Sequence, residues 1–254
     1  MSLLDIRNIH KTYYSGAEVL KNVNFSIESK ECLGLIGESG CGKSTLARCL
    51  LQIEPIDEGS ILFNGRELSD KSERVLKPYR RNMQAVLQNP ASALNPKLKV
   101  RESIIDPFQQ YGSQVDMKHL TYTSERDFIA QLLEMVELPK SLAERYPHEL
   151  SGGQKQRVTI ARAISIEPSL IILDEPASSL DVLSQASLLT LLGELRERLG
   201  MSYLFISHDL PAVQEMCQRI MVMKEGEIVD AFETELLLCA DRHPYTKELI
   251  SLFD

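Results

Sequence analysis

Short apolar runs and longer amphipathic stretches alternate along this chain of 254 residues. The runs at residues 32–36, 170–173 and 203–206 predict buried strands, because strands covered on both faces are apolar throughout. Spacing and capping residues predict helices at residues 46–51, 128–136, 151–165 and 184–199, after Pro211, and at the C-terminus. Strands that alternate with helices in this way predict an α/β fold.

Turn residues divide the remaining segments. Residues 1–65 alternate short strands with turns, which we expect at residues 28–30 and 57–59 and at Asn64-Gly65, after a strand at residues 60–63. Residues 89–165 favour helix over most of their length. A hairpin is predicted over residues 220–229, with its turn at Glu225-Gly226.

Composition argues against several classes of protein. A net charge of −8 indicates no basic surface for nucleic acid, and the cluster Lys77, Arg80 and Arg81 fits a solvated face. Five cysteines without C-x-x-C spacing favour a reducing compartment over a disulfide framework or a zinc site. We expect no signal peptide, and no apolar run approaches the ~20 residues of a membrane helix. An apolar content of 43% suffices for one large domain or for a core with an inserted subdomain.

The strongest chemical signal lies between the first apolar strand and the helix that follows it. The pattern G-x-x-x-x-G-K-S between a strand and a helix predicts a loop whose backbone N–H groups surround phosphate oxygens. The dipole of the following helix favours the same anion. We expect Lys43 to reach the β- and γ-phosphates of a nucleotide, and Ser44 to bind Mg²⁺. The loop consists of Gly37, Glu38, Ser39, Gly40, Cys41, Gly42, Lys43, Ser44 and Thr45.

One cysteine lies inside this loop. Cys41 is close in sequence to Lys43 and to a helix N-terminus, an environment that makes a thiol reactive. An inert small residue is the alternative interpretation. We expect a maleimide to label Cys41 faster than the other four cysteines, and MgATP to protect it.

Two carboxylates follow the strand at residues 170–173. Ligands bind at the carboxyl ends of strands in open α/β sheets, which is where Asp174 and Glu175 are expected. We expect Asp174 to hold Mg²⁺ through water and Glu175 to act as general base on the attacking water. A solvated turn is the alternative for this pair alone, but together with the phosphate loop it indicates hydrolysis of a nucleoside triphosphate.

A second helix also begins with an anion-binding pattern. Ser151 is a good N-cap, and Gly152 and Gly153 leave the backbone N–H groups of the first turn open. One triphosphate does not need two such sites in one chain. The economical interpretation is a site that serves a nucleotide held by another subunit, whereas an ordinary capped helix is the alternative for S-G-G by itself.

The segment at residues 150–154, with Ser151, Gly152, Gly153 and Gln154, resembles the signature motif of ATP-binding-cassette ATPases, and essentially the whole chain fits that family. The resemblance implies that Tyr13 stacks on adenine and that Gln88 is the Q-loop ligand of Mg²⁺ and water. Residues 178–181, which end in Asp181, resemble the D-loop, with Ser179 as a departure from the usual S-A-L-D. His208 resembles the switch histidine that contacts the γ-phosphate.

Two further segments are similar to those of oligopeptide, dipeptide and nickel importer ATPases, so the resemblance implies an ATP-hydrolysing subunit that energises the import of peptides, nickel or a metal chelate. They are the loop at residues 88–96 and the H-P-Y-T sequence that begins at His243. A proline-rich connector and a plain terminal helix are the respective alternatives. Many members of that group are longer, so we expect this chain, which stops at Asp254, to be the shorter member of a pair.

The resemblance implies a P-loop NTPase (RecA-like) core, with an antiparallel β subdomain and an inserted helical subdomain. The expected single domain spans residues 1–254, with the core at 1–88 and 166–254 and the helical subdomain at 89–165. It also implies ATP and Mg²⁺, a second cassette that is a distinct paralogue or an identical copy, two membrane permease subunits and, indirectly, an extracytoplasmic solute-binding protein. The expected location is the cytoplasmic face of the cell membrane.

Two other functions are compatible with a cassette of this kind. One is a soluble ATPase that acts on ribosomes or DNA, which usually carries two cassettes, long coiled-coil insertions or basic arms. The other is a non-catalytic nucleotide-binding regulatory subunit. Intact Lys43, Ser151, Glu175 and His208 argue against the second.

Overall fold

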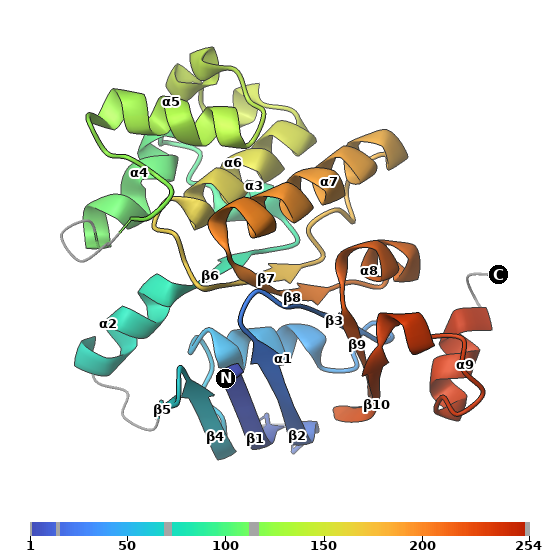
Figure 1. The fold of residues 1–254 in the computed structure, drawn as a ribbon. Coiled ribbons are helices and arrows are strands. Elements are labelled where there is room, and N and C mark those ends of the chain that lie inside the picture. Colours follow the sequence, from blue (N-terminus) through green and yellow to red (C-terminus); the bar gives the residue numbers. More distant parts are fainter. Residues whose placement is uncertain (1, 14–15, 69–72, 112–116, 252–254) are drawn as a thin grey trace. The chain divides into compact units, whose positions relative to one another are not determined.

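The computed structural model describes residues 2–13, 16–68, 73–111 and 117–251 (Figure 1). The chain forms two compact units. The first unit combines Met1–Tyr79 with Ser202–Asp254, and the second unit is Arg80–Met201. Helix α2 (Glu73–Asn82) contains residues of both. None of the helices in the described part of the chain has the length and apolar character needed to cross a membrane.

The first unit contains an antiparallel sheet with the strand order β2-β1-β4-β5. Its strands are β1 (Ser2–Thr12), β2 (Glu18–Glu28), β4 (Glu58–Phe63) and β5 (Arg66–Glu67). The β4–β5 connection turns at Asn64 and Gly65, both with positive φ, as predicted. The two first strands have 11 residues each, so the expectation of short strands here is wrong.

The turn expected at residues 57–59 is also wrong, because Glu58 and Gly59 belong to β4. Gly59 has a φ of 97°, and a Cβ atom at this position would lie 2.3 Å from the carbonyl oxygen of Asn8 in β1. The glycine therefore allows two strand backbones to approach closely. Glycine within a strand commonly marks such an approach instead of a turn.

The first unit also contributes four strands to a mostly parallel sheet, in the order β10-β9-β3-β8. They are β3 (Cys32–Ile36), β8 (Ser202–Ile206), β9 (Arg219–Lys224) and β10 (Glu227–Glu233). All residues of β3 and β8 are buried, which confirms the prediction from their apolar runs. The predicted hairpin is present, and its turn residues Glu225 and Gly226 have positive φ. The helical elements of this unit are α1 (Lys43–Leu50), α8 (Leu210–Met216), η4 (Thr234–Leu236) and α9 (Pro244–Ser251).

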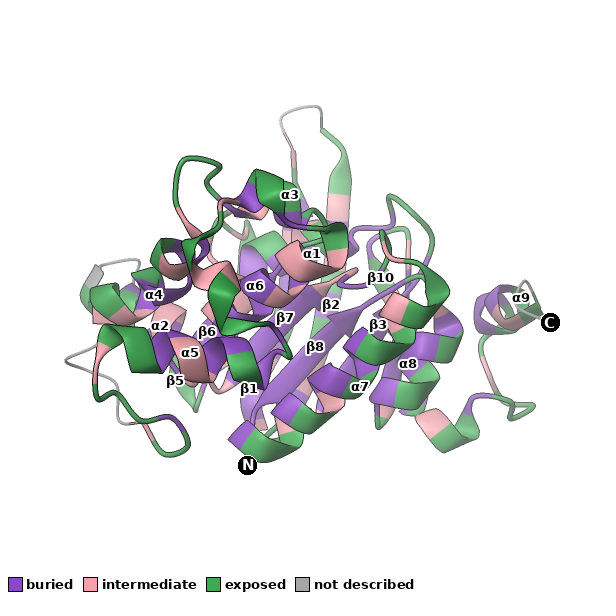
Figure 2. Cartoon of the chain, turned by 90° about the horizontal axis from the view of Figure 1, so that it is seen from above, coloured by how far each residue is buried: buried purple, intermediate pink, exposed green. Residues whose placement is uncertain are grey.

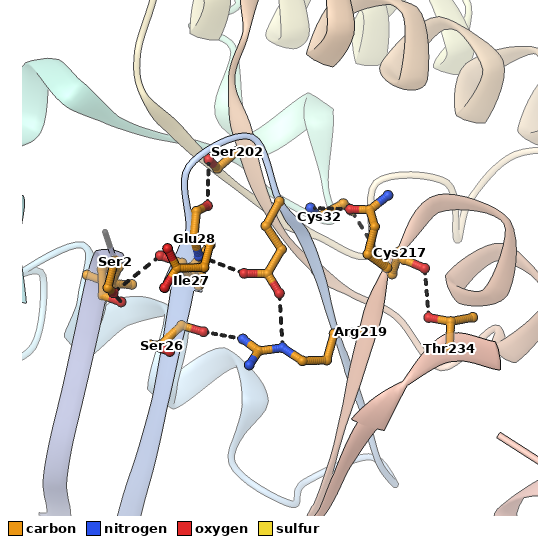
Figure 3. A network of polar contacts seen from close by, with 12 residues as sticks. Ser2, Ser26, Ile27, Glu28, Cys32, Ser202, Cys217, Arg219 and Thr234 are labelled. Atoms are coloured by element: carbon orange, nitrogen blue, oxygen red, sulfur yellow. Dashed lines mark hydrogen bonds and ion pairs between the residues drawn. The ribbon is translucent and has the colours of Figure 1, made fainter. Parts of the chain in front are cut away.

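Polar contacts join the strand ends of the first unit opposite to the phosphate loop (Figure 3). Arg219, at the start of β9, donates from Nε to Glu31 Oε1 at 3.0 Å and from Nη2 to the carbonyl oxygen of Ser26 at 2.5 Å. The Ser202 hydroxyl accepts from Lys30 N and donates to the Glu28 carbonyl oxygen. These bonds fix the start of β3, the strand that carries the loop at its other end.

In the second unit, β6 (Met83–Val86) pairs in parallel with β7 (Leu170–Asp174). No pattern in the sequence predicted β6. The helices confirm the predicted positions to within a few residues at each end, and Figure 2 shows how α7 divides into a buried and an exposed side. They are α3 (Pro90–Ala93), α4 (Val100–Tyr111), α5 (Glu125–Met135), η2 (Lys140–Glu144), η3 (Pro147–Glu149), α6 (Gly152–Ile164) and α7 (Val182–Leu199).

Arg157 of α6 connects three parts of the second unit. Its Nη1 atom donates to the Val136 carbonyl oxygen at 2.8 Å and to Glu137 Oε2 at 2.7 Å, and its Nη2 atom donates to Ser187 Oγ at 2.9 Å. These contacts hold α6 between the end of α5 and α7. The helical subdomain expected at residues 89–165 contains α3 to α6, and its bounds stay a prediction.

Candidate functional site

At two positions, the loop after β3 adopts a backbone conformation that requires glycine. Gly37 has a φ of 154°, and a Cβ atom there would lie 2.2 Å from the Met223 carbonyl oxygen. Gly42 has a φ of 113°, and its Cβ atom would lie 2.8 Å from the Val19 carbonyl oxygen. The loop therefore packs its backbone directly on β9 and β2, while residues 38–40 stay exposed at its rim.

Lys43 lies inside this loop with only 7% of its surface exposed. Its Nζ atom donates to the carbonyl oxygens of Gly37 at 2.7 Å and Glu38 at 2.8 Å, and lies 3.7 Å from Cys41 Sγ. These partners are neutral carbonyl groups and not carboxylates, so they do not compensate the charge that an anion would meet. This geometry fits the contact with phosphate that the sequence predicts for Lys43.

The expected order of cysteine labelling does not agree with the structure. Cys41 is buried together with Cys32, Cys49 and Cys217, whereas Cys239 is exposed. Access to the reagent limits labelling as much as thiol chemistry does. The burial of Cys41 therefore argues against the prediction that it reacts first, and Cys239 is the more accessible thiol.

Tyr13 follows β1 and lies beside the phosphate loop. Its hydroxyl donates to Glu54 Oε2 at 2.5 Å and lies 3.5 Å from the hydroxyl of Thr45, the last residue of the loop. Lys11 Nζ lies 5.9 Å from the centre of the ring. The structure thus places the Tyr13 side chain near the loop through its hydroxyl group, and stacking of the ring on a base remains a prediction. Glu54, which holds the phenol, was not predicted to belong to the site.

In the second unit, the structure joins two predicted site residues directly. Gln88 follows β6, and Glu175 follows the end of β7 at Asp174. The Nε2 atom of Gln88 donates to Glu175 Oε2 at 2.7 Å. Glu175 has a φ of 49°, a conformation uncommon outside glycine and often found at functional sites. The pair can hold a general base in one orientation.

The signature residues form the predicted helix start. Ser151 Oγ accepts from Gln154 N at 3.2 Å, and Gln154 Oε1 accepts from Ser151 N at 3.0 Å, so the two residues form a capping box at α6. No heavy atom would lie within 4 Å of a Cβ atom at Gly152. A hollow of about 450 Å³ opens beside these residues, and Ser151, Gly153, Gln154, Leu180 and Leu183 are part of its lining. The first turn of α6 is therefore open to a ligand.

Asp181 precedes the predicted helix α7, and His208 follows the predicted strand β8. Asp181 caps α7 and accepts from Ser184 N at 3.0 Å and from Ser184 Oγ at 2.7 Å. These hydrogen bonds from Ser184 lower the pKa of Asp181. His208 is exposed just after β8. The nucleotide contacts expected of both residues remain predictions.

The predicted residues are divided between the two units. Tyr13, residues 37–45 and His208 belong to the first unit. The second unit holds Gln88, residues 151–154, Asp174, Glu175 and Asp181. Sequence reasoning missed Glu54, which no motif signals, and the contact of the loop with Tyr245, for which the H-P-Y-T motif was an available signal.

The donor atoms expected for Mg²⁺ are the Ser44 hydroxyl, the Gln88 amide oxygen and the Asp174 carboxylate. Gln88 donates to Glu175 through Nε2, so its Oε1 atom remains available to a cation. Ser44 is exposed in the first turn of α1. Mg²⁺ prefers hard oxygen ligands and keeps several waters or phosphate oxygens, so the chemistry of each of these donors fits Mg²⁺.

Comparisons with known proteins agree on one family. Residues 20–178 match the family model described as ABC transporter. The oligopeptide transport ATP-binding proteins AppF and OppF of Bacillus subtilis are 39% and 40% identical to the chain. The alignments cover 98% of this chain in both cases, and 78% of AppF and 81% of OppF.

Solved structures support the same fold. The ATP-binding cassette MJ0796, a dimer in a post-hydrolysis state bound to ADP and Pi, has a TM-score of 0.80 and is 29% identical, over 91% of this chain and 98% of that one. CbiO1 from Clostridium perfringens, part of the ABC transporter complex CbiONQ, has the same TM-score and is 28% identical over 98% and 99% of the two chains. The predicted P-loop NTPase fold is thereby confirmed.

Proposed function

Since this chain belongs to the ABC transporter family, whose cassettes hydrolyse ATP, we propose that it is the ATPase subunit of a peptide importer. The names of AppF and OppF, each about two-fifths identical over nearly the whole chain, support peptides as the transported solute. Nickel or a metal chelate was the alternative that the sequence left open.

The observation that carries this proposal is the presence of two separate anion-binding helix starts in one chain. The first is the phosphate loop with buried Lys43, and the second is the open first turn of α6 behind Ser151. Two cassettes that face each other head to tail would use both, because the loop of one and the signature helix of the other close on the same ATP. The cassette MJ0796, solved as a dimer bound to ADP and Pi, is a precedent for a pair of cassettes that holds nucleotide.

The catalytic roles follow from the side-chain chemistry. Lys43 and His208 of one cassette and the signature amides of the other stabilise the charge of the transferred phosphoryl group. Stabilising this charge is the main catalytic requirement of phosphoryl transfer. Glu175 accepts a proton from the attacking water, and Gln88 holds its carboxylate. Ser44, Gln88 and Asp174 would hold Mg²⁺, which would supply neutralisation of phosphate charge.

We further propose a distinct, related cassette as partner, with two permease subunits and an extracytoplasmic solute-binding protein. The complex would place this chain on the cytoplasmic face of the cell membrane. ATP and ADP contact the two cassettes differently, so hydrolysis would shift the pair from closed to open and pass that change to the permeases.

The test is ATP turnover in the assembled complex. The chain, its partner cassette and the permeases are reconstituted in liposomes with the solute-binding protein, and phosphate release is measured with a peptide mixture and with Ni²⁺. Stimulation by peptides, absent in a Lys43→Ala complex, supports the proposal. Stimulation by Ni²⁺ alone would contradict the peptide assignment, and association with ribosomes instead of permeases would contradict the transport function.

A further inference from the structure

The H-P-Y-T motif has no role in the ATP chemistry above, although the structure holds it firmly. The motif covers residues 243–246 at the start of α9, and Asp230 of β10 anchors it. The Oδ2 atom of Asp230 accepts from His243 N at 2.8 Å and from Thr246 Oγ1 at 2.9 Å. Thr246 is completely buried. The start of this terminal helix is thus held in two places by a carboxylate from another element.

This anchor directs Tyr245 toward the phosphate loop. The Tyr245 side chain is almost fully buried, and Lys224 Nζ lies 4.4 Å from the centre of its ring. The phenol oxygen accepts a hydrogen bond from the backbone N–H of Glu38 at 3.2 Å. Glu38 is the second residue of the loop, and it lies 207 positions before Tyr245 in the sequence.

The same peptide group also contacts Lys43. The N–H of Glu38 and the carbonyl of Gly37 belong to one peptide unit, which is planar and rigid. Tyr245 binds the N–H end of this unit, and Lys43 Nζ donates to its carbonyl end at 2.7 Å. Gly37 has no Cβ atom, so its backbone can adopt conformations that other residues avoid, including those that would rotate this unit. A fixed acceptor at the N–H end therefore selects one orientation.

We propose that Tyr245 is a positioning residue for Lys43, acting through the peptide unit between Gly37 and Glu38. This inference rests on the proposed function of the loop in binding ATP. It assigns the H-P-Y-T segment to the maintenance of the loop conformation that the triphosphate requires. Burial raises the pKa of Tyr245, so its hydroxyl stays neutral at physiological pH and keeps a lone pair for the Glu38 N–H.

The decisive variant is Tyr245→Phe, which keeps the buried ring and its contact with Lys224 and removes only the oxygen. We expect the Kd for ATP to rise about 10-fold, in line with an N–H group that loses its acceptor. Binding of adenosine, which has no phosphates, should be unchanged. Isothermal titration calorimetry measures both.

A second readout needs no nucleotide. Hydrogen–deuterium exchange of the Glu38 amide should become faster in Tyr245→Phe, because the bond that protects it is lost. Thr246→Val, which removes one contact of the Asp230 anchor, should shift both measurements in the same direction by a smaller factor. Thr246 lies outside the loop, so an effect of this variant on Glu38 must pass through the anchor of Tyr245.

Tyr79→Phe is the matched control. Tyr79 is also a buried tyrosine of the first unit, and its hydroxyl donates to the Leu50 carbonyl oxygen at the far end of α1. It should lower the melting temperature without changing the Kd for ATP or the exchange of Glu38. If Tyr245→Phe leaves both values at those of the wild type, the positioning role is wrong. If the wild-type chain itself does not bind ATP, the proposed function fails, and the exchange of Glu38 still decides on the contact with Tyr245.

Discussion

The side-chain amide of Gln88 donates a hydrogen bond to the carboxylate of Glu175, with 2.7 Å between the two atoms. The residues are 87 positions apart, and each follows one of two paired parallel strands, β6 and β7. The carboxyl ends of parallel strands lie at the same edge of a sheet, so the pairing itself brings the two side chains together.

Replacing Glu175 by Gln should preserve ATP binding and slow turnover by about 10²-fold or more, because the amide cannot accept the proton of the attacking water. Gln keeps the size of the side chain and can still accept the hydrogen bond from Gln88. Steady-state phosphate release by the assembled transporter measures the effect. Turnover equal to the wild type would exclude Glu175 as general base.

Gln88→Ala should have a smaller effect on turnover. The carboxylate of Glu175 keeps its chemistry and loses the hydrogen bond that orients it, which predicts a decrease in kcat of about 10-fold. The double variant with Glu175→Gln should lose less than the product of the two single losses, because one of the two roles proposed for Gln88 acts on that carboxylate. Additive losses in this double-mutant cycle would show that Gln88 acts independently of Glu175.

Features set by residues close together in the sequence could be predicted, whereas features set by distant residues could not. The phosphate loop, the capping box at Ser151 and the hairpin at Glu225 each have a signature in neighbouring residues, so local patterns were sufficient to locate them. Strand β6 is short and lacks a distinctive pattern, and its existence depends on pairing with β7. Gly59 shows the limit of turn signals, because a close strand approach and a turn both favour glycine.

The contacts that sequence reasoning missed are long-range. Tyr13 meets Glu54 at a separation of 41 residues, and Tyr245 meets Glu38 at 207. The motif search identified Tyr13 but not Glu54. It identified both the phosphate loop and the H-P-Y-T segment, but their contact is defined only by the folded chain.

Glu54→Ala should weaken ATP binding about 5-fold, because the Tyr13 hydroxyl loses its charged acceptor and the ring is less well oriented for the base. Tyr13→Phe should give a similar Kd, and the double variant should add little to either. Arg48→Ala is the control, since it removes the exposed ion pair of Glu54 at 3.4 Å and leaves the bond to Tyr13. A Glu54→Ala variant that binds ATP like the wild type would remove Glu54 from the site.

Thiol labelling should follow exposure and pKa. Cys239 is exposed and should react first with a maleimide, ahead of buried Cys41. Burial, followed by the charge of Glu54, raises the pKa of Cys49 to about 11. A raised thiol pKa lowers the thiolate fraction, to about one part in a thousand at pH 8, and labelling of Cys49 should increase only as the pH approaches 11. Mass spectrometry of peptides after timed labelling gives the order, and early modification of Cys49 at pH 8 would contradict it.

The head-to-tail arrangement of two cassettes makes the sharpest prediction for Ser151. A Ser151→Arg change in this chain alone should abolish trapping of nucleotide at the phosphate loop of the partner cassette, because the bulky cation occupies the open first turn of α6. Nucleotide at this chain's own loop should still bind, since that site would use the partner's signature helix. Photo-crosslinking of an azido-ATP, followed by separation of the two cassettes, measures each site.

Ser124→Arg is the matched control for this change. Ser124 caps α5 in the same unit and accepts from Asp127 N, as Ser151 does from Gln154 N at α6. Loss of either cap should cost about 1 kcal/mol of stability, so the two variants are comparable in folding. Only Ser151→Arg should empty the partner's site. Equal trapping in both variants, or full activity of the isolated chain, would mean that the signature helix does not complete a site on another subunit.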